Sequence, residues 1–285
     1  MTTQALQIGF IEQAHRIYLF DEVYPLSAAK EQAEKKKLAA FGMLAKFNPL
    51  NRPREDTVML TRHELRLEPF WHIVAQRQVD YEARVTYPVP VHNPHALGVS
   101  LAGQRFDVAR QSEKTARIDV EAVEHCHRKL DFDAYLDGLE RDLRAKMLEG
   151  YCAKYKFSEA QQLDRPEIVK PLLAEQAAIQ KARSALLGHA INAHEINQDH
   201  IVFEKVYLYL RPVFAFEFVW SSADKVGVIE VNGLTGEVNE DGRWFKEKLD
   251  KILTRDMLIE ASSELAGAFV PGGGLAVKLI GRVTE

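Results

Sequence analysis

Cysteine is scarce in this chain, and so are the long apolar runs that cross membranes. Its two cysteines, Cys126 and Cys152, do not form a Cys-x-x-Cys pair, which excludes a disulfide framework and a thiolate zinc finger. No apolar stretch reaches the roughly 18 residues of a spanning helix. The most apolar one, residues 257–280, is interrupted by charged residues and by the Pro-Gly-Gly-Gly turn at 271–274. Residues 1–10 lack the form of a secretory signal, so the sequence predicts a cytoplasmic protein without a transmembrane span.

An excess of charge of one sign is also missing. The chain has 37 Lys and Arg against 41 Asp and Glu, which gives a formal net charge of -4. This balance provides no general attraction to nucleic acid or to an acidic membrane, so we expect no nucleic-acid partner. Signature motifs of common enzymes are absent too: there is no Gly-x-Ser-x-Gly elbow, no His-Glu-x-x-His helix and no dinucleotide fingerprint. The sequence therefore favours a protein that is not an enzyme.

The feature that is present is an internal similarity between the two halves of the chain. Residues 56–73 match residues 199–216 without a gap, so that Pro69 falls on Pro212. Two further matches occur in the same order. Upstream, Glu31-Gln32-Ala33 lies over Glu175-Gln176-Ala177, and downstream residues 99–103 lie over 229–233. Three matches in one order predict an internal duplication.

Each copy has the pattern of a helix followed by antiparallel strands. The upstream segments are rich in Ala, Leu, Lys and Gln, which favour helices, and residues 65–67 and 208–210 alternate as half-buried strands do. We expect each proline to interrupt the strands, with the next strand beginning at Phe70 or Val213. The predicted fold class is α+β with a duplicated unit. The halves are residues 1–155 and 156–285, and the repeated units are about 28–108 and 172–241.

Three more elements are expected outside the repeated units. Residues 116–123 alternate as a strand. Residues 131–155 present an apolar stripe that predicts a helix, formed by Tyr135, Leu136, Leu139, Leu143 and Met147. A C-terminal helix is expected at about 245–269, before the glycine turn and a short apolar tail.

The segments around the two prolines resemble the soluble α+β region of a group of uncharacterised bacterial zinc-ribbon proteins. The resemblance rests on residues 67–71 with Tyr81 beyond them, and on residues 210–214 leading into 231–238. The Asn-Gly-x-Thr-Gly-Glu turn at 232–237 is similar to the closing hairpin of PepSY-type domains, which are small binding or inhibitory modules. This chain lacks the ribbon. The resemblance implies an α+β fold and carries no information about activity, and its motifs mark candidate binding residues, namely Trp71, Tyr81, Asn232 and Gly233.

Histidines of the first half provide a candidate metal site. His125 and His127 are two residues apart on a strand, so both side chains face one side and could reach one metal. A third ligand from His92, His95 or His72 would complete the open three-His arrangement of zinc hydrolases. The alternative is that these are ordinary surface or loop histidines.

The sequence as a whole favours a non-enzymatic binding or scaffolding protein. Its partner would be another protein or a second copy of the chain, docked on an open sheet edge or on the apolar tail, which could also touch a membrane surface. Two alternatives remain: a metal-dependent hydrolase built on the histidines, and a small-ligand sensor with its site between the two halves.

Overall fold

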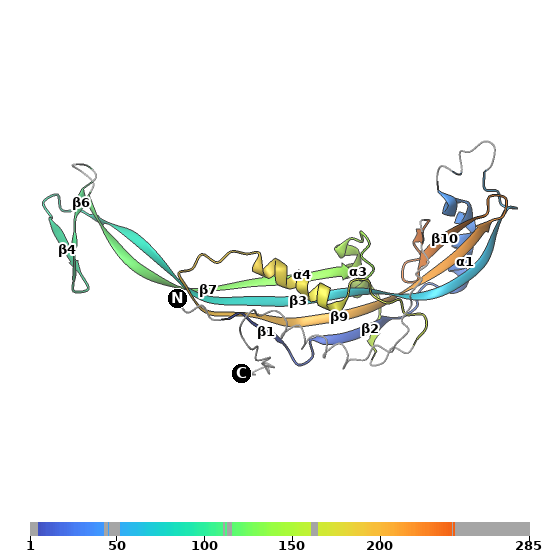
Figure 1. The fold of residues 1–285 in the computed structure, drawn as a ribbon, viewed down its shortest axis with the longest axis horizontal. Helices are drawn as coiled ribbons and strands as arrows, with labels where there is room; N and C mark the ends of the chain where they lie inside the picture. The colour runs from blue at the N-terminus through green and yellow to red at the C-terminus, as the bar shows by residue number, and fades with distance from the viewer. Residues whose placement is uncertain are drawn as a thin grey trace.

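The computed structural model describes residues 5–42, 45, 52–110, 112, 116–160, 165–240 and 242. The helix expected at 245–269 and the tail lie outside these residues. The molecule is elongated, with a long twisted sheet and short helices, so the α+β class is confirmed (Figure 1). Across the described residues, no helix has both the length and the apolar character required to span a membrane.

The helices are α1 (Leu26–Lys36), the short 3-10 helix η1 (Lys37–Phe41), α3 (Ala145–Lys154) and α4 (Glu175–Leu187). The strands are β1 (Gln7–Phe10), β2 (His15–Phe20), β3 (Val58–Val91), β4 (Gly98–Leu101), β5 (Gln104–Asp107), β6 (Ala109–Arg110), β7 (Ala116–Asp137), β8 (Phe157–Glu159), β9 (Glu195–Trp220), β10 (Lys225–Asn232) and β11 (Val238–Asn239).

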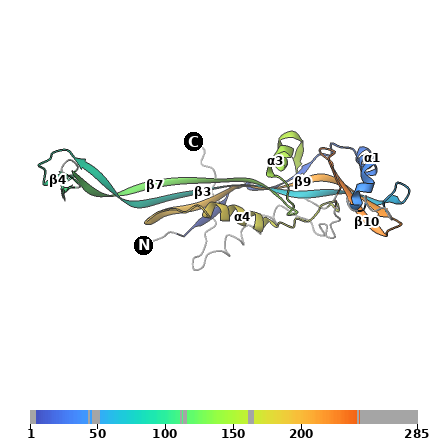
Figure 2. The ribbon, with the colours of Figure 1, turned by 90° about the horizontal axis from the view of Figure 1, so that it is seen from above.

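The centre of the sheet is the antiparallel pair of β3 and β9. β7 lies on the outer side of β3, and β10 lies on the outer side of β9, so the strand order is β11-β10-β9-β3-β7-β6. β1 and β2 run parallel to the first half of β9, on the same side as β10. Figure 2 shows the twist of these long strands and the helices beside them.

β3 has 34 residues, several times the usual length of a strand. β9 begins at Glu195, opposite Glu82. Beyond that point β3 and β7 continue as a two-stranded arm that ends near the β4–β5 hairpin (Figure 1, left). Pro88 and Pro90 lie in the arm, two residues apart, so both ring nitrogens face one edge. Proline on an exposed edge protects it from pairing with other strands.

The expectation that Pro69 and Pro212 interrupt the strands is wrong, because β3 and β9 each run straight through their proline. Both prolines lie where the neighbouring strand changes. β2 pairs with β9 up to Leu210, and β10 takes over from Val213. A proline tolerates this position because its missing N–H faces the gap between two neighbours.

Two matching corners flank the centre of the β3–β9 pair. The backbone N–H of Gly138 donates to the carbonyl of Pro69 at 3.0 Å, and that of Gly233 donates to the carbonyl of Pro212 at 2.9 Å. Each glycine carbonyl in turn accepts two backbone N–H groups from the segment that leads into a helix. These donors are Leu172 and Leu173 before α4 for Gly138, and Val23 and Tyr24 before α1 for Gly233.

The structure changes two sequence expectations in this region. Residues 99–101 belong to β4 in the arm, whereas residues 229–232 lie in the body beside β9. The helix expected at 131–155 is also wrong: β7 continues to Asp137, and only Ala145–Lys154 is helical. Pairing with β3 overrides the helical stripe, and Glu140 turns the chain with a positive φ of 54°.

Both α1 and α4 cover the same face of the sheet. Along β9, the even-numbered residues from Leu208 to Phe218 point to this face, since side chains alternate. Leu208 and Trp71 pack with α4, while Phe216 and Phe218 pack with α1. The opposite face carries a third cluster, in which α3 covers Phe70 and Tyr209.

Alanine at Gly138 is expected to lower the free energy of unfolding by about 1–3 kcal/mol, the usual cost of overpacking. A Cβ at this position would lie 2.6 Å from the carbonyl oxygen of Pro69. Gly150 is the matched control, because its Cβ would meet nothing within 4 Å and it lies inside α3. Alanine at Gly150 should instead stabilise by roughly 0.5–1 kcal/mol. Chemical denaturation measures the free energy of unfolding of both variants. Equal changes at Gly138 and Gly150 would contradict the close packing at the Gly138 corner.

Candidate functional site

A network of buried charges lies at the centre of the β3–β9 pair. Glu68 is fully buried and accepts hydrogen bonds from three arginines: Arg66 at 2.9 Å, Arg141 at 2.8 Å and Arg211 at 2.7 Å. Arg66 also donates to Glu230 at 2.5 Å. Arg141 further donates to Asp137 at 2.8–3.0 Å through its side chain and backbone.

The network balances its own charge. Arg66, Arg141 and Arg211 face Glu68, Asp137 and Glu230, so opposite charges match one for one among these residues. Burial alone would raise the pKa of Glu68, but Arg211, Arg141 and Arg66 outweigh it and hold that pKa below its ordinary value. Glu68 is therefore an ionised carboxylate at neutral pH, and its partners depend on its charge.

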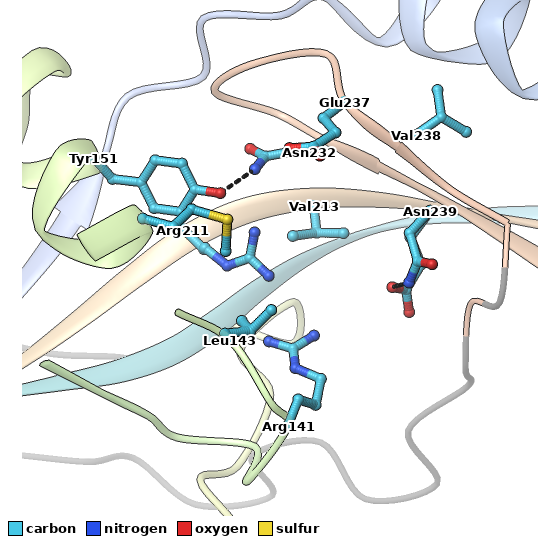
Figure 3. A pocket seen from close by; sticks show the side chains of 11 residues that line it. Arg141, Leu143, Tyr151, Arg211, Val213, Asn232, Glu237, Val238 and Asn239 are labelled. Atoms are coloured by element: carbon cyan, nitrogen blue, oxygen red, sulfur yellow. Dashed lines mark hydrogen bonds between the residues drawn. The ribbon is translucent and has the colours of Figure 1, made fainter. Parts of the chain in front are cut away.

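A pocket of about 320 Å³ opens beside this network (Figure 3). Its walls come from the turn after β7, from α3, and from β9, β10 and β11. The lining combines polar and apolar side chains. The residues are Arg141, Leu143, Met147, Tyr151, Arg211, Val213, Glu230, Asn232, Glu237, Val238 and Asn239.

Arg211 is the most informative residue of the pocket. It is only 7% exposed, and its guanidinium lies next to the ring of Tyr151, 5.8 Å from the ring centroid. Among the described residues, Glu68 is the acceptor that the structure gives to this side chain. A guanidinium has five N–H groups, so within the described part of the chain most of those of Arg211 have no acceptor and can face the pocket that this residue lines.

The neighbours of Arg211 form a fixed wall. Asn232 donates from Nδ2 to the hydroxyl of Tyr151 at 2.8 Å, while its Oδ1 accepts the backbone N–H of Leu234 at 2.9 Å. Burial raises the pKa of Tyr151, so the phenol is neutral and can donate its own proton. On the same helix, burial raises the pKa of Cys152 to about 11, which makes this thiol a poor nucleophile at neutral pH.

The structure does not bring the five candidate metal-binding histidines together. His125 and His127 do point to one face of β7, but each pairs with a different carboxylate of β3, Glu82 at 3.2 Å and Asp80 at 2.6 Å. His72 pairs with Asp133 at 2.8 Å, and burial lowers its pKa despite that partner.

His72 and the pair His92 and His95 lie far from His125 along the sheet. His72 is ten residues from Glu82 on β3, a distance of roughly 33 Å. His92 and His95 follow the end of β3 in the arm, whereas His125 lies opposite Glu82 at the base of the arm.

The candidate binding residues have separate places. Trp71 is 1% exposed and donates from Nε1 to the carbonyl of Leu173 at 2.9 Å, so it fastens α4 to the sheet. Tyr81 lies on β3 opposite Cys126. Asn232 lines the pocket, and Gly233 forms the corner against Pro212.

Arg211, Arg141 and Glu68 are not among the site residues that the sequence patterns predict. A signal for two of them was present. In the matched segments Leu67-Glu68-Pro69 and Leu210-Arg211-Pro212, the middle residues have opposite charges, as expected of residues that pair across two strands.

Comparison of the chain with protein-family models, with curated proteins and with solved structures finds no match in any of the three.

Proposed function

We propose that this protein is a non-enzymatic binding protein that holds a small organic acid in the pocket beside Arg211. The observation that carries the proposal is a buried guanidinium with unmatched N–H groups at the wall of a pocket. Arginine binds carboxylates through two parallel hydrogen bonds. A ligand carboxylate would supply the acceptor.

The size and lining of the pocket support a small, singly charged ligand. A volume of about 320 Å³ is at the lower end of the range for small-molecule sites. Two arginines and two glutamates line it, so a polyanion would meet repulsion from Glu230 and Glu237. Leu143, Met147 and Val238 would contact an apolar portion of the ligand.

We also propose that the body of the molecule consists of two copies of one unit related by a local twofold axis at Glu68 and Arg211. The register supports this, because Leu67 pairs with Pro212 just as Pro69 pairs with Leu210. The two corners at Gly138 and Gly233 agree with it, since the carbonyl of each glycine accepts backbone N–H groups from the segment that precedes a helix. On this hypothesis the true counterpart of residues 231–233 is residues 136–138, which pair with β3 in the same way.

The ligand proposal is tested with the singly charged acids benzoate, hexanoate and glutamate as probes in a thermal-shift series. We expect at least one to raise the melting temperature, because a ligand at a hundred times its Kd adds about 2.7 kcal/mol of stability. Arg211→Met should abolish the shift. Arg117→Met is the matched control, since Arg117 is an exposed arginine that pairs with Asp119 outside the pocket.

Calorimetric titration of Arg211→Lys keeps the test decisive even if Arg211→Met fails to fold. Lysine preserves the charge and loses the planar fork, so the affinity should fall by at least about tenfold. Binding that survives both substitutions, or no binding of any probe to the unchanged protein, would reject the proposal.

Protein docking on the arm is a second candidate function. It is favoured by apolar side chains exposed there, since Tyr87, Val89 and Leu97 are 45%, 38% and 81% exposed. Removal of residues 86–117 would leave the pocket in place, so a loss of partner capture with retained ligand binding would separate the two functions.

A further inference from the structure

The register of three strands places metal-ligand side chains in one row at the base of the arm. Glu82 on β3 pairs with His125 on β7 at one side and with Glu195 on β9 at the other. Residues directly opposite each other across strands share a face of the sheet. The row His125–Glu82–Glu195 is therefore built by pairing alone, at the point where β9 begins.

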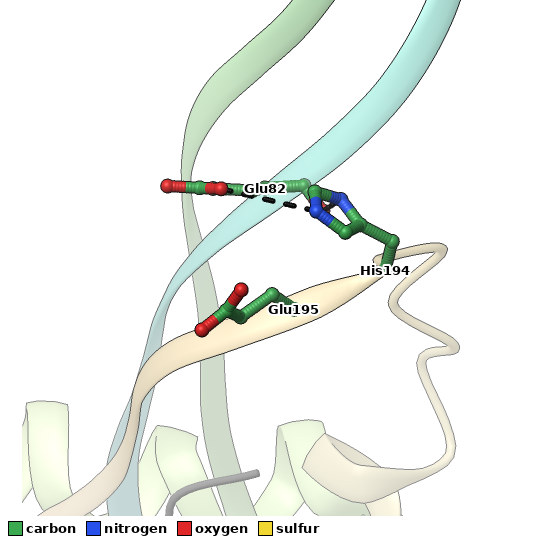
Figure 4. Close-up of side chains that lie close together, drawn as sticks. All are labelled: Glu82, His194 and Glu195. Atoms are coloured by element: carbon green, nitrogen blue, oxygen red, sulfur yellow. Dashed lines mark hydrogen bonds and ion pairs between the residues drawn. The ribbon is translucent and has the colours of Figure 1, made fainter. Parts of the chain in front are cut away.

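His194 adds a second imidazole to this row (Figure 4). The carboxylate and imidazole atoms of Glu82, His194 and Glu195 lie within 4.8 Å of one another. Nε2 of His194 is 3.9 Å from Oε2 of Glu82, while Nδ1 of His125 is 3.2 Å from Oε1 of the same carboxylate. Glu82 thus lies between two histidines, one at each oxygen.

The backbone fixes the tautomer of His194. Its Nδ1 lies 2.9 Å from the carbonyl oxygen of Glu82, and because a carbonyl can only accept, Nδ1 carries the proton. The neutral ring then has its lone pair on Nε2, which is the atom near the carboxylates. A histidine held in this way by a backbone carbonyl is the usual arrangement of a metal ligand. The backbone N–H of His194 donates to the same carbonyl at 2.9 Å, which fixes the residue further.

We propose that His125, Glu82, His194 and Glu195 bind one divalent transition-metal ion, zinc by preference. Two imidazoles and two carboxylates are ligands that zinc accepts at about 2.0–2.2 Å. Around a tetrahedral ion such ligand atoms lie roughly 3.4 Å apart, so small side-chain rotations would bring Glu82, His194 and Glu195 to this spacing. His125, which contacts Glu82, would turn toward the same ion. Four protein ligands leave no open position, which is typical of a structural site. The ion would tie β7, β3 and β9 together where the sheet narrows to the arm.

Zinc titration of the metal-stripped, untagged full chain tests the proposal, with metal counted by elemental analysis. We expect one zinc per chain and a rise in melting temperature. Glu82→Gln and His194→Ala should each weaken zinc binding by at least about tenfold. His127→Ala is the matched control, because His127 lies two residues from His125 on the same face but pairs with Asp80.

Cobalt provides an independent readout. Co²⁺ in a tetrahedral site with nitrogen and oxygen ligands gives visible d–d bands, which Glu82→Gln should remove and His127→Ala should keep. Absence of stoichiometric zinc, or equal losses in His127→Ala and His194→Ala, would overturn the proposal. Glu82 lies roughly 45 Å along β3 from Glu68, so this result is independent of ligand binding beside Arg211.

Discussion

We expect the Glu68→Gln protein to unfold with a free energy about 3–5 kcal/mol lower than that of the unchanged protein, the usual cost of breaking a buried charge pair. Glu68 is fully buried and accepts from Arg66, Arg141 and Arg211. Glutamine keeps the shape but removes the charge that these three arginines share. Urea unfolding followed by far-ultraviolet circular dichroism measures the difference.

The control for this substitution is Glu31→Gln. Glu31 is an exposed residue of α1 that pairs with Lys35 one turn away, and exposed pairs of this kind contribute little. Its unfolding curve should overlay that of the unchanged protein. A Glu68→Gln curve that also overlays would show that the buried network does not hold the β3–β9 pair together.

The stability of Glu68→Gln should also depend less on acid pH than the stability of the unchanged protein does. The folded pKa of Glu68 is lowered from 4.5. The stabilisation by its charge is therefore complete above the unfolded pKa and is lost as pH falls through the folded pKa. As pH falls below 4.5, the unchanged protein should therefore lose more stability than Glu68→Gln does. Parallel losses in the two proteins would assign the acid response to other groups.

Local patterns predicted the strands and helices well where one face is buried. Leu65-Arg66-Leu67 and Leu208-Tyr209-Leu210 alternate, and both lie in long strands. The alternating pattern did not predict how long these strands are. The outer part of β3, which includes Pro88 and Pro90, is stabilised by pairing with β7 rather than by a buried face, and such pairing leaves no pattern in the sequence. The segment at 131–137 was misread for a related reason: its apolar residues fit a helix period, and pairing with β3 decided the outcome.

The candidate sites depended on register, which sequence periodicity does not contain. Glu82, His125 and Glu195 are far apart in the chain and form one row only because β3 pairs with both β7 and β9. Likewise, Arg141 reaches Glu68 because the turn after β7 folds back over the centre of the sheet. Histidines counted along the sequence could identify His125, but not the carboxylate that faces it.

Alanine at Trp71 is expected to lower the free energy of unfolding by about 3–5 kcal/mol, the usual range for a large aromatic in a core. Trp71 is 1% exposed and packs in the same cluster as Ala178, Ile179 and Leu208. Its Nε1 also donates a hydrogen bond of 2.9 Å to the carbonyl of Leu173, which lies directly before α4. The loss should therefore include release of α4 from the sheet, which hydrogen exchange of the α4 amides would detect.

Trp71→Phe separates the packing from the hydrogen bond. Phenylalanine keeps most of the ring volume and leaves the carbonyl of Leu173 without its donor, which costs about 1–3 kcal/mol. Tyr87→Ala, at an exposed aromatic of the arm, should leave the unfolding curve unchanged. Trp71 is not one of the residues that line the pocket, so ligand binding by Trp71→Phe should match that of the unchanged protein. Retained stability in Trp71→Ala, together with lost ligand binding, would instead make Trp71 a binding residue, as the sequence resemblance implies.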